Sequence, residues 1–289
     1  EKKLKEFTDR DKNLKKEHDM KLLTLIDKKV NNNIELTLDE LKFLYEIDSK
    51  IEGFGYEKDP RINEIKNKRN IKKDCALIFD VKEEEVALSQ EEWEENQNKF
   101  KIFVSDLYLY GLTSADGLVL PQSVVGNLFL DNLTSAEGLV LPQNIGGNLD
   151  LRSLDSAVGL VLPQNIGGDL YLYSLASAEG LVLPQSIGGD LYLNGLTSAK
   201  GLILPQSIVG NLFLDNLTSA DGLVLPQNVG GNLDLWYLTS AEGLILPYGF
   251  DLDKLECSSY IKNEILQNPD KYFRKPPSEE ENISVHHKR

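Results

Sequence analysis

Side chains able to carry out chemistry are few in this 289-residue chain, and few are spaced for catalysis. Its three histidines, His18, His286 and His287, lie outside the central region, and neither Cys75 nor Cys257 has a histidine near it in sequence. The motifs of nucleotide-binding loops, zinc proteases and serine hydrolases do not occur. We therefore expect a protein that is not an enzyme and that carries no cofactor or metal site.

Two carboxylates and one arginine could still imitate a catalytic cluster. Asp131 and Arg152 are 21 residues apart, and Asp150 lies beside Arg152, so a chain that coils with this period would place them on one face. Acids and a base on one sheet face can cleave polysaccharides. The segments between them are short and uniform and lack the long loops that build a cleft, so a β-helix carbohydrate-active enzyme is the less favoured alternative.

The element that must position these residues is a 21-residue unit that runs seven times through the middle of the chain. Repetition at a period of roughly 20 to 50 residues is typical of a solenoid, in which each unit buries its apolar side against its neighbours. The unit reads N/D-L-x-L-x-x-L-T-S-A-E/D-G-L-V/I-L-P-Q-S/N-I/V-G/V-G. One leucine marks each unit: Leu107, Leu128, Leu149, Leu170, Leu191, Leu212 and Leu233.

Alternation within the unit predicts which side chains point inward. Leu128 and Leu130 are expected inside and Phe129 outside, as in a half-buried strand. The other inward residues of this unit are Leu133, Leu139, Leu141 and Ile145. Gly138 recurs in every unit, as a position with positive φ would, and Pro142 marks a corner because it cannot donate to a strand ladder.

The turn of each unit contains small and polar residues. Ser135 and Ala136 are small enough for a tight corner, and the serine hydroxyl can accept a hydrogen bond from a turn amide. No segment of the unit is long enough for a regular α-helix. We therefore expect short strands and turns, with a 3₁₀ turn around residues 134–138.

Over residues 107–250 the unit resembles leucine-rich repeats, whose units of roughly 20 to 29 residues place Leu-x-Leu strands on a concave face. It departs where the family has an asparagine after Leu-x-Leu-x-x, because a leucine stands there instead, as in Leu109-Tyr110-Gly111-Leu112. The asparagine ladder of that family is therefore missing. The Gly-Asn/Asp-Leu-x-Leu start also resembles the coils of receptor L domains, so an all-β three-sided solenoid is the alternative.

Helix signals gather before the repeats. Thr37 and Glu40 form a capping box, Asp59 can cap a second helix, and Ser89 with Glu92 forms another capping box. Residues 76–79 read as a short strand. Residues 35–70 resemble stretches of uncharacterised proteins from candidate-phylum bacteria, which implies a bacterial source and no activity.

These signals predict an α+β fold: a seven-coil leucine-rich-repeat-like or β-solenoid with an α-rich N-terminal cap domain and a short C-terminal cap. The cap domain is expected to dock on the first coil and cover its open edge. The expected parts are a charged N-terminal helix (1–33), an α-rich capping domain (34–100), the solenoid (101–250), a C-terminal cap (251–275) and a disordered tail (276–289).

Charge limits the partners of the repeats. The chain has a net charge of −15, and residues 101–250 hold 3 basic and 13 acidic side chains. Phosphate backbones would be repelled, so we expect no nucleic acid on the repeats and instead a protein partner with a basic face. A further acidic column (Asp116, Glu137, Glu179, Asp221 and Glu242) could bind calcium, but it lacks the calcium-binding nonapeptide, so a solvated face is favoured.

The compartment is predicted from what the chain contains. No apolar stretch is long enough for a membrane span, no signal peptide is visible, and the two cysteines stand too far apart along the array for a disulfide. We expect a cytoplasmic monomer without membrane contact. Because the chain starts at Glu1 rather than at a methionine, it is also expected to be a fragment or a processed product.

Outward positions of stacked units form columns rich in aromatic residues, and we expect this sheet face to bind a protein. Two alternatives stay open for the face itself: aromatic stacking that only stabilises the sheet, or cover by a flanking domain. The alternative function is a structural or adhesive spacer of a larger surface protein. The candidate binding residues are Tyr108, Tyr110, Phe129, Arg152, Tyr171, Tyr173, Tyr192, Phe213 and Trp236.

Overall fold

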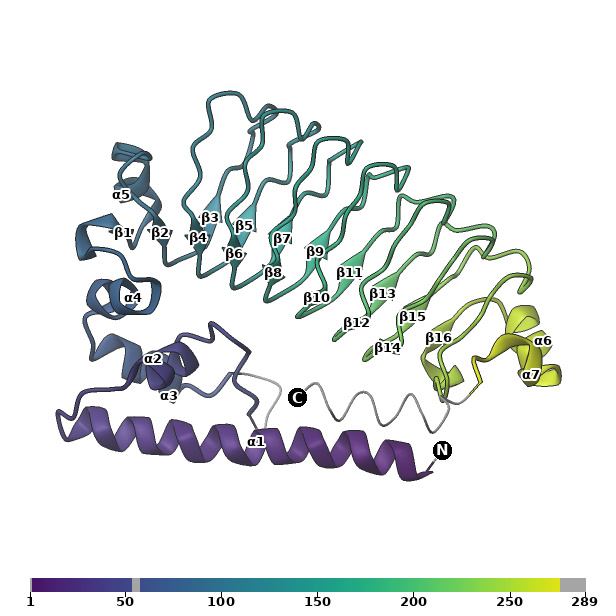
Figure 1. Ribbon diagram of the computed structural model, residues 1–289, viewed down its shortest axis with the longest axis horizontal. Helices are drawn as coiled ribbons and strands as arrows, with labels where there is room; N and C mark the ends of the chain where they lie inside the picture. Colours follow the sequence, from purple (N-terminus) through teal and green to yellow (C-terminus); the bar gives the residue numbers. More distant parts are fainter. Residues whose placement is uncertain (1, 54–57, 276–289) are drawn as a thin grey trace.

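A computed structural model describes the backbone of residues 2–53 and 58–275 and the side chains from residue 13 onward. It contains a parallel β-solenoid of about seven turns, with helices at its N-terminal end and a short helical segment at its C-terminal end (Figure 1). The predicted fold class is confirmed. The predicted tail at 276–289 lies outside the described residues.

Two parallel sheets, which we call sheet A and sheet B, run the length of the solenoid. Every strand is two residues long, and within the repeats each residue pairs with the residue 21 positions away, as Leu191 does with Leu170 and Leu212. Sheet A contains β1 (Val86–Ala87), β2 (Ile102–Phe103), β4 (Ser123–Val124), β6 (Asn144–Ile145), β8 (Asn165–Ile166), β10 (Ser186–Ile187), β12 (Ser207–Ile208) and β14 (Asn228–Val229). Sheet B contains β3 (Leu107–Tyr108), β5 (Leu128–Phe129), β7 (Leu149–Asp150), β9 (Leu170–Tyr171), β11 (Leu191–Tyr192), β13 (Leu212–Phe213), β15 (Leu233–Asp234) and β16 (Leu255–Glu256).

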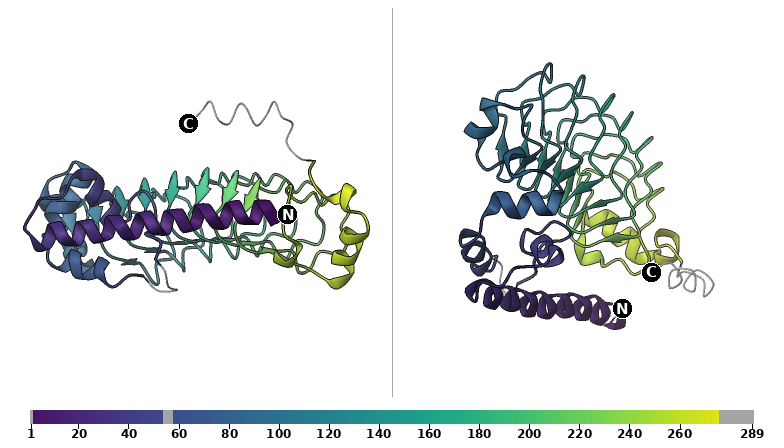
Figure 2. Two further views of the ribbon diagram at one scale, coloured as in Figure 1. Left: turned by 90° about the horizontal axis from the view of Figure 1, so that it is seen from below. Right: turned by 60° about the vertical axis from the view of Figure 1, so that its left-hand side comes forward.

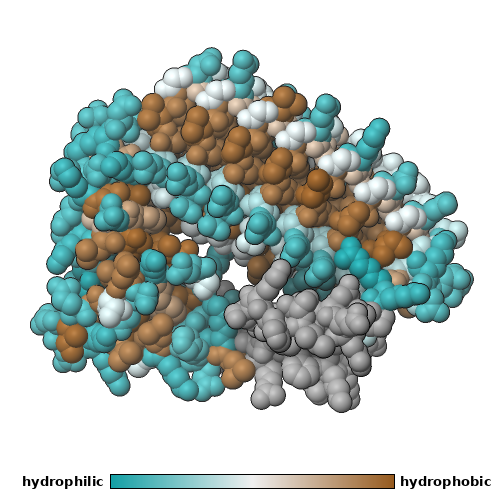
Figure 3. Space-filling model, viewed as in Figure 1, coloured by the Kyte–Doolittle hydropathy of each residue, from teal (hydrophilic) through white to brown (hydrophobic). Residues whose placement is uncertain are grey.

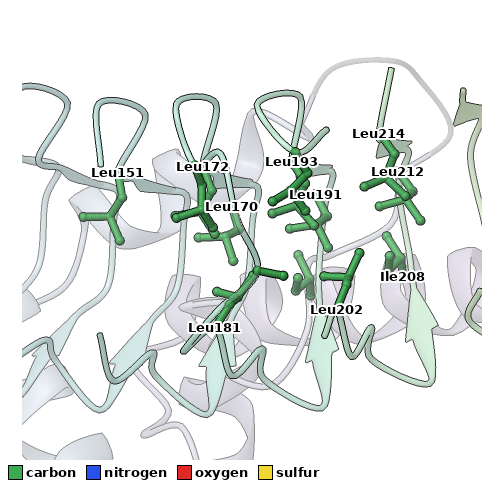
Figure 4. Packing of buried hydrophobic residues seen from close by; sticks show 14 of the residues in the cluster. Leu151, Leu170, Leu172, Leu181, Leu191, Leu193, Leu202, Ile208, Leu212 and Leu214 are labelled. Carbon is green, nitrogen blue, oxygen red and sulfur yellow. The ribbon is translucent and has the colours of Figure 1, made fainter. Parts of the chain in front are cut away.

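The solenoid core consists of stacked aliphatic columns (Figure 4). Leu128 and Leu130 are fully buried, Phe129 between them is half-buried, and Ile145 closes the coil from sheet A. Leu141 is the one predicted inward residue that stays half-buried. Burial of a leucine side chain contributes about 2 kcal/mol, and these columns supply several per coil, so no coil is stable without its neighbours.

The corner after sheet B is a β-turn rather than the predicted 3₁₀ turn. The Leu139 N–H donates to the Ala136 carbonyl at 3.1 Å, and Gly138 has φ 75°, as the third residue of a type II turn requires. This bond is not followed by another of the same kind at the next residue, so no helix forms here. The serine prediction is confirmed, because Ser135 Oγ accepts the Glu137 N–H at 3.2 Å.

The N-terminal helices form a second core around Leu23, Ile26, Leu44 and Ile65. Thr37 makes the predicted capping box with Glu40. These elements are α1 (Lys2–Asn31), α2 (Leu38–Leu44), α3 (Arg61–Asn67), α4 (Ile71–Phe79), η1 (Glu83–Glu85) and α5 (Gln90–Glu95).

The predicted strand at residues 76–79 is wrong, because these residues end helix α4. Asn70 caps the start of α4 by accepting the Lys73 N–H at 3.1 Å, and Asp80, with φ 53°, ends it in the left-handed conformation. A run of four apolar residues fits a strand and a buried helical turn equally well. The cap residues on each side decide between them.

The cap docks on the first coil through the pair β1 and β2, whose residues alternate between the two cores. Val86 and Ile102 lie in the helical core, while Ala87 and Phe103 lie in the solenoid core. Trp93 of α5 is fully buried and meets Phe103 edge-on, with ring centroids 6.5 Å apart. The open end of the solenoid is therefore covered, as predicted.

The remaining elements are η2 (Leu252–Lys254), α6 (Ser259–Gln267) and α7 (Pro269–Tyr272), which lie at the C-terminal end (Figure 1). Leu255 of β16 pairs with Leu233 and so extends sheet B by one irregular coil. Helix α1 runs along the length of the solenoid on its concave side (Figures 1 and 2). No helix of the described residues is both long and apolar enough to cross a membrane.

Both cysteines are free and buried. Cys75 lies in the helical core and Cys257 in the solenoid core. Burial raises the pKa of the Cys75 thiol to about 12 and raises the pKa of Cys257 as well. Both therefore behave as small apolar residues of the two cores.

Candidate functional site

The outward residues of sheet B form one continuous row along the solenoid. Register places each row residue directly beside its counterpart in the next coil, as Tyr171 beside Tyr192 and Tyr192 beside Phe213. Alternation in the sequence predicts this row, and the structure brings its members together. The row consists of Tyr108, Phe129, Asp150, Tyr171, Tyr192, Phe213 and Asp234.

The rings of this row stack face to face. Tyr192 and Phe213 have ring centroids 4.4 Å apart with their planes at 4°, and Tyr171 lies 4.7 Å from Tyr192 at 17°. Tyr108 and Phe129 form a separate stack, 4.9 Å apart at 2°. Parallel stacking directs the ring faces at neighbouring coils and leaves the ring edges on the surface.

A second outward row is more exposed. Tyr110 is 62% exposed and leans on Tyr108, with ring centroids 5.3 Å apart, and Tyr173 lies 5.1 Å from Tyr192. Trp236 is 58% exposed at the C-terminal end of the same side. Tyr110 and Trp236 are therefore the candidate rings that a partner can reach most easily, followed by Tyr108 and Tyr173 at 38% and 36% exposed.

Coil three interrupts the aromatic row with an ion pair. The Asp150 side chain is fully buried, and Arg152 donates to it from Nε at 3.0 Å and from Nη2. The Arg152 guanidinium also lies 5.8 Å from the centroid of Tyr171, at the exposed end of the second stack. The predicted binding residue Arg152 therefore holds a buried carboxylate and covers a ring face.

A ladder of asparagine and aspartate side chains runs beside the aromatic row, and it was not predicted from the sequence. In coils one to six the residue before the strand leucine accepts, through Oδ1, the backbone N–H of its counterpart one coil later, at 2.6 to 2.8 Å. The signal that could have found it is an Asn or Asp at this position in all seven units. The ladder consists of Asp106, Asn127, Asn148, Asp169, Asp190, Asn211 and Asn232.

The ladder residue correlates with the ring two positions later. Coils with a tyrosine carry aspartate, as in Asp169 with Tyr171, where the hydroxyl donates to Oδ2 at 2.8 Å. Tyr192 with Asp190 and Tyr108 with Asp106 repeat this at 3.1 Å. Coils with phenylalanine or aspartate in the row carry asparagine. A carboxylate has a second oxygen free to accept the hydroxyl, whereas an asparagine offers only a donor there.

These hydrogen bonds fix the tyrosine rings. Burial, followed by the hydrogen bond to the ladder aspartate, raises the pKa of Tyr171 and of Tyr192 far above the usual range. Both hydroxyls therefore stay protonated, and each ring is held at its hydroxyl and on both faces. The row is a rigid surface.

The correlation leads to a prediction at coil five. We expect Asp190→Asn to lower the free energy of unfolding by about 1 kcal/mol, because the charged acceptor of the Tyr192 hydroxyl is lost. The double variant Asp190→Asn/Tyr192→Phe copies the Asn211 and Phe213 pair of coil six. We therefore expect Tyr192→Phe to cost less stability in the Asp190→Asn background than in the wild type. Urea unfolding of the four proteins gives the coupling energy, and additive losses would contradict the assignment.

The other predicted column, with Asp116, Glu137 and Glu179, lies in the exposed turns. Nowhere in the described part of the chain do three or more His, Cys, Asp or Glu side chains gather in a way that could hold a metal ion. Comparisons with protein families, with characterised proteins and with solved structures give no match for this chain.

Proposed function

We propose that the chain is a non-catalytic, leucine-rich-repeat-like binding protein that holds a protein partner on the outward side of sheet B. The observation that carries this proposal is the rigid aromatic row with the exposed rings of Tyr110, Tyr173 and Trp236 beside it. Aromatic residues held in one conformation contribute contact area at low entropic cost. A surface of rings with fixed conformations suits the binding of a protein and does not itself supply catalytic groups.

The electrostatics of the solenoid favour a basic partner. Residues 101–250 carry a net charge of −10, from 3 basic and 13 acidic side chains. Arg152 over Tyr171 is an example within the chain of how a cation lies on an exposed ring face. Lysines and arginines of a partner would meet both the rings and the surrounding carboxylates.

The stacking argues against a sugar or a nucleobase bound at the centre of the aromatic row. Such ligands use the face of an aromatic ring, and here both faces of Tyr192 are occupied by Tyr171 and Phe213. Asp150 does not support the alternative of a carbohydrate-active enzyme, because its carboxylate is buried and paired with Arg152. Ring edges and hydroxyls remain for contact with a protein.

A structural spacer is the second candidate, and one observation favours it. The Asn/Asp ladder links all seven coils, ring stacks join coils one and two and coils four to six, and the cap elements cover the first coil. A rod of this kind would serve as a spacer even if nothing bound to its sheet. The experiment must therefore separate binding from rigidity.

Affinity capture from cells of the source organism separates these two functions. The variant Tyr110→Ala/Tyr173→Ala/Trp236→Ala removes exposed rings whose loss leaves the core and the ladder intact. We expect it to reduce capture of a specific partner at least about tenfold, a loss of about 1.4 kcal/mol. Tyr248→Ala/Tyr260→Ala removes equally exposed rings outside sheet B and serves as the matched control.

The deeper variant Tyr171→Ala/Tyr192→Ala/Phe213→Ala tests the centre of the row. It should abolish capture, and its melting temperature reports how far the stack also stabilises the fold. Equal capture by the wild type and by both sheet B variants would contradict the binding proposal and favour the spacer.

A further inference from the structure

Each coil has a third side, which lies between its turn and sheet A. This side forms no strand in coils one to six of the repeat array. In coil two this side is residues 138–142, where Leu139 is buried and Val140 points outward. The outward residue is Val or Ile in every coil, and five of them are 67% to 77% exposed. We call these five the aliphatic row: Val140, Val161, Val182, Ile203 and Val224.

The aliphatic row is more exposed than the aromatic row of sheet B, whose rings are mostly half-buried. A band of hydrophobic surface crosses successive coils in Figure 3. The row does not build the core, because Leu139 and Leu141 and their equivalents fill the inside of this side. Soluble monomers rarely expose a contiguous apolar strip of this length, so we expect a binding partner to cover it.

Acidic side chains flank the aliphatic row along one edge. An acidic turn residue stands three positions before three of the five aliphatic residues: Glu137 before Val140, Glu179 before Val182 and Asp221 before Val224. The position is fixed, because Ser135 accepts the Glu137 N–H and Ser177 accepts the Glu179 N–H. Glutamines such as Gln143 stand exposed along the other edge. The strip is therefore apolar in the middle, negative on one edge and neutral on the other.

The acidic edge is interrupted in two coils, and these interruptions define how a partner can be aligned along the row. Val158 replaces the acid in coil three, and an open depression there is lined by Glu137, Val140 and Val158. Lys200 reverses the charge in coil five. From coil one to coil seven the edge therefore reads negative, negative, neutral, negative, positive, negative, negative. The order differs when it is read backwards, so a partner with matching charges can lie in one direction only.

We propose that the aliphatic row docks an amphipathic α-helix with a cationic edge. Coils repeat at about 4.8 Å, and an α-helix presents one apolar side chain per turn of about 5.4 Å, so a helix laid along the row meets one aliphatic residue per turn. Seven coils span roughly 29 Å, the length of about 19 helical residues. This side offers no edge strand for an extended peptide to join, so side chains must make the contact.

Charge complementarity selects this occupant over a second copy of the chain. Two copies would bring two solenoids of net charge −10 together, whereas lysines of a helix neutralise the acidic edge. Basic side chains would face Glu137, Glu179 and Asp221, and an acidic one would face Lys200. The surface is separate from sheet B, so it can be tested independently of the proposed function.

The test uses a synthetic, fluorescein-labelled peptide of about 19 residues with leucines on one face, lysines along one edge and a glutamate placed to meet Lys200. Binding is measured by fluorescence anisotropy at about 0.15 M salt. We expect the folded protein to bind it, and Val161→Asp/Ile203→Asp to weaken binding at least about tenfold. Tyr110→Ala/Tyr173→Ala, on sheet B, should bind the peptide as the wild type does.

Two further measurements can overturn the proposal. Glu137→Gln/Glu179→Gln should weaken binding and reduce its salt dependence, because it removes charge and keeps shape. Equal binding by this variant, or by a peptide with glutamates in place of the lysines, would remove the electrostatic argument. Sedimentation would identify a second copy as the occupant if the wild type dimerised and Val161→Asp/Ile203→Asp did not. Circular dichroism confirms that each variant is folded.

Discussion

Replacing Gly189 by alanine is expected to lower the free energy of unfolding by about 3 kcal/mol, the upper end of the range for overpacking. A Cβ at this position would lie 2.1 Å from Asp169 Oδ1 and 2.8 Å from the Gly168 carbonyl carbon. Asp169 Oδ1 accepts the Asp190 N–H, so the carboxylate cannot move without breaking a rung of the ladder. The backbone on the other side of the Cβ cannot move without separating two coils.

The neighbouring glycine provides the matched control. A Cβ at Gly188 would approach the Gly167 carbonyl oxygen at 2.4 Å, yet two coils carry Val125 and Val209 at the equivalent position. The backbone nitrogen of Val209 lies 3.4 Å from its acceptor oxygen on the preceding coil and that of Val125 lies 2.8 Å from its acceptor, compared with 3.0 Å for Gly188, so both coils accept the side chain and keep this hydrogen bond. We expect Gly188→Ala to cost about 1 kcal/mol.

Urea unfolding followed by circular dichroism compares the two variants. A larger loss for Gly189→Ala would show that the ladder, and not the crowded corner alone, requires glycine there. Equal losses would mean that both glycines only relieve backbone crowding. Because neighbouring coils stabilise one another, a clash in coil four or five should affect the whole array.

Periodicity made much of the fold predictable. A leucine every 21 residues implies a solenoid, and alternation around Leu128 and Leu130 identifies the inward and outward sides of sheet B. The positive φ of Gly138 also follows from its recurrence. Each of these features depends on one residue type at one position, which is the kind of information a repeat displays directly.

Features that depend on pairs of positions are harder to predict. The ladder requires knowing that Asp169 Oδ1 meets a backbone N–H one coil later, which follows only from the register of the corner. Alternation continues through Leu139, Val140 and Leu141 on the third side, but that Val140 is left uncovered there depends on where the cap elements lie, which the repeat unit does not show. The apolar run within helix α4 predicts a strand because the caps that decide otherwise, Asn70 and Asp80, lie outside that run.

The candidate site likewise contains features that the sequence predicts and features that it does not. The sequence predicts that Tyr171 and Tyr192 are neighbours, and the structure confirms this arrangement. It does not predict that an outward charged residue, Asp150, is fully buried, because burial results from the side chain of Arg152 folding over it. Which of these residues contact a partner stays a prediction.

Removal of that arginine should have the second large effect. We expect Arg152→Ala to lower the free energy of unfolding by about 2 kcal/mol, because Asp150 Oδ2 loses its donors on a carboxylate that still has Phe129 and Tyr171 as its neighbours in the row. The backbone N–H at this position would still donate to Oδ1, and half of the Arg152 side chain is already exposed, so the loss stays below that of a fully buried pair. Thermal and urea unfolding measure the difference.

The coil pattern itself supplies the compensating variant. Asn148→Asp/Asp150→Tyr/Arg152→Tyr gives coil three the residues that coil four carries as Asp169, Tyr171 and Tyr173. It replaces the ion pair by a ring held between Phe129 and Tyr171, with its hydroxyl on a ladder carboxylate, and should unfold at a urea concentration near that of the wild type. If this triple variant were as unstable as Arg152→Ala, the pairing of aspartate with tyrosine would not be what stabilises these coils. A different outcome is a triple variant that is stable and yet fails to capture the partner. An uninterrupted aromatic row would then be insufficient for recognition, and Asp150 and Arg152 would belong to the binding surface.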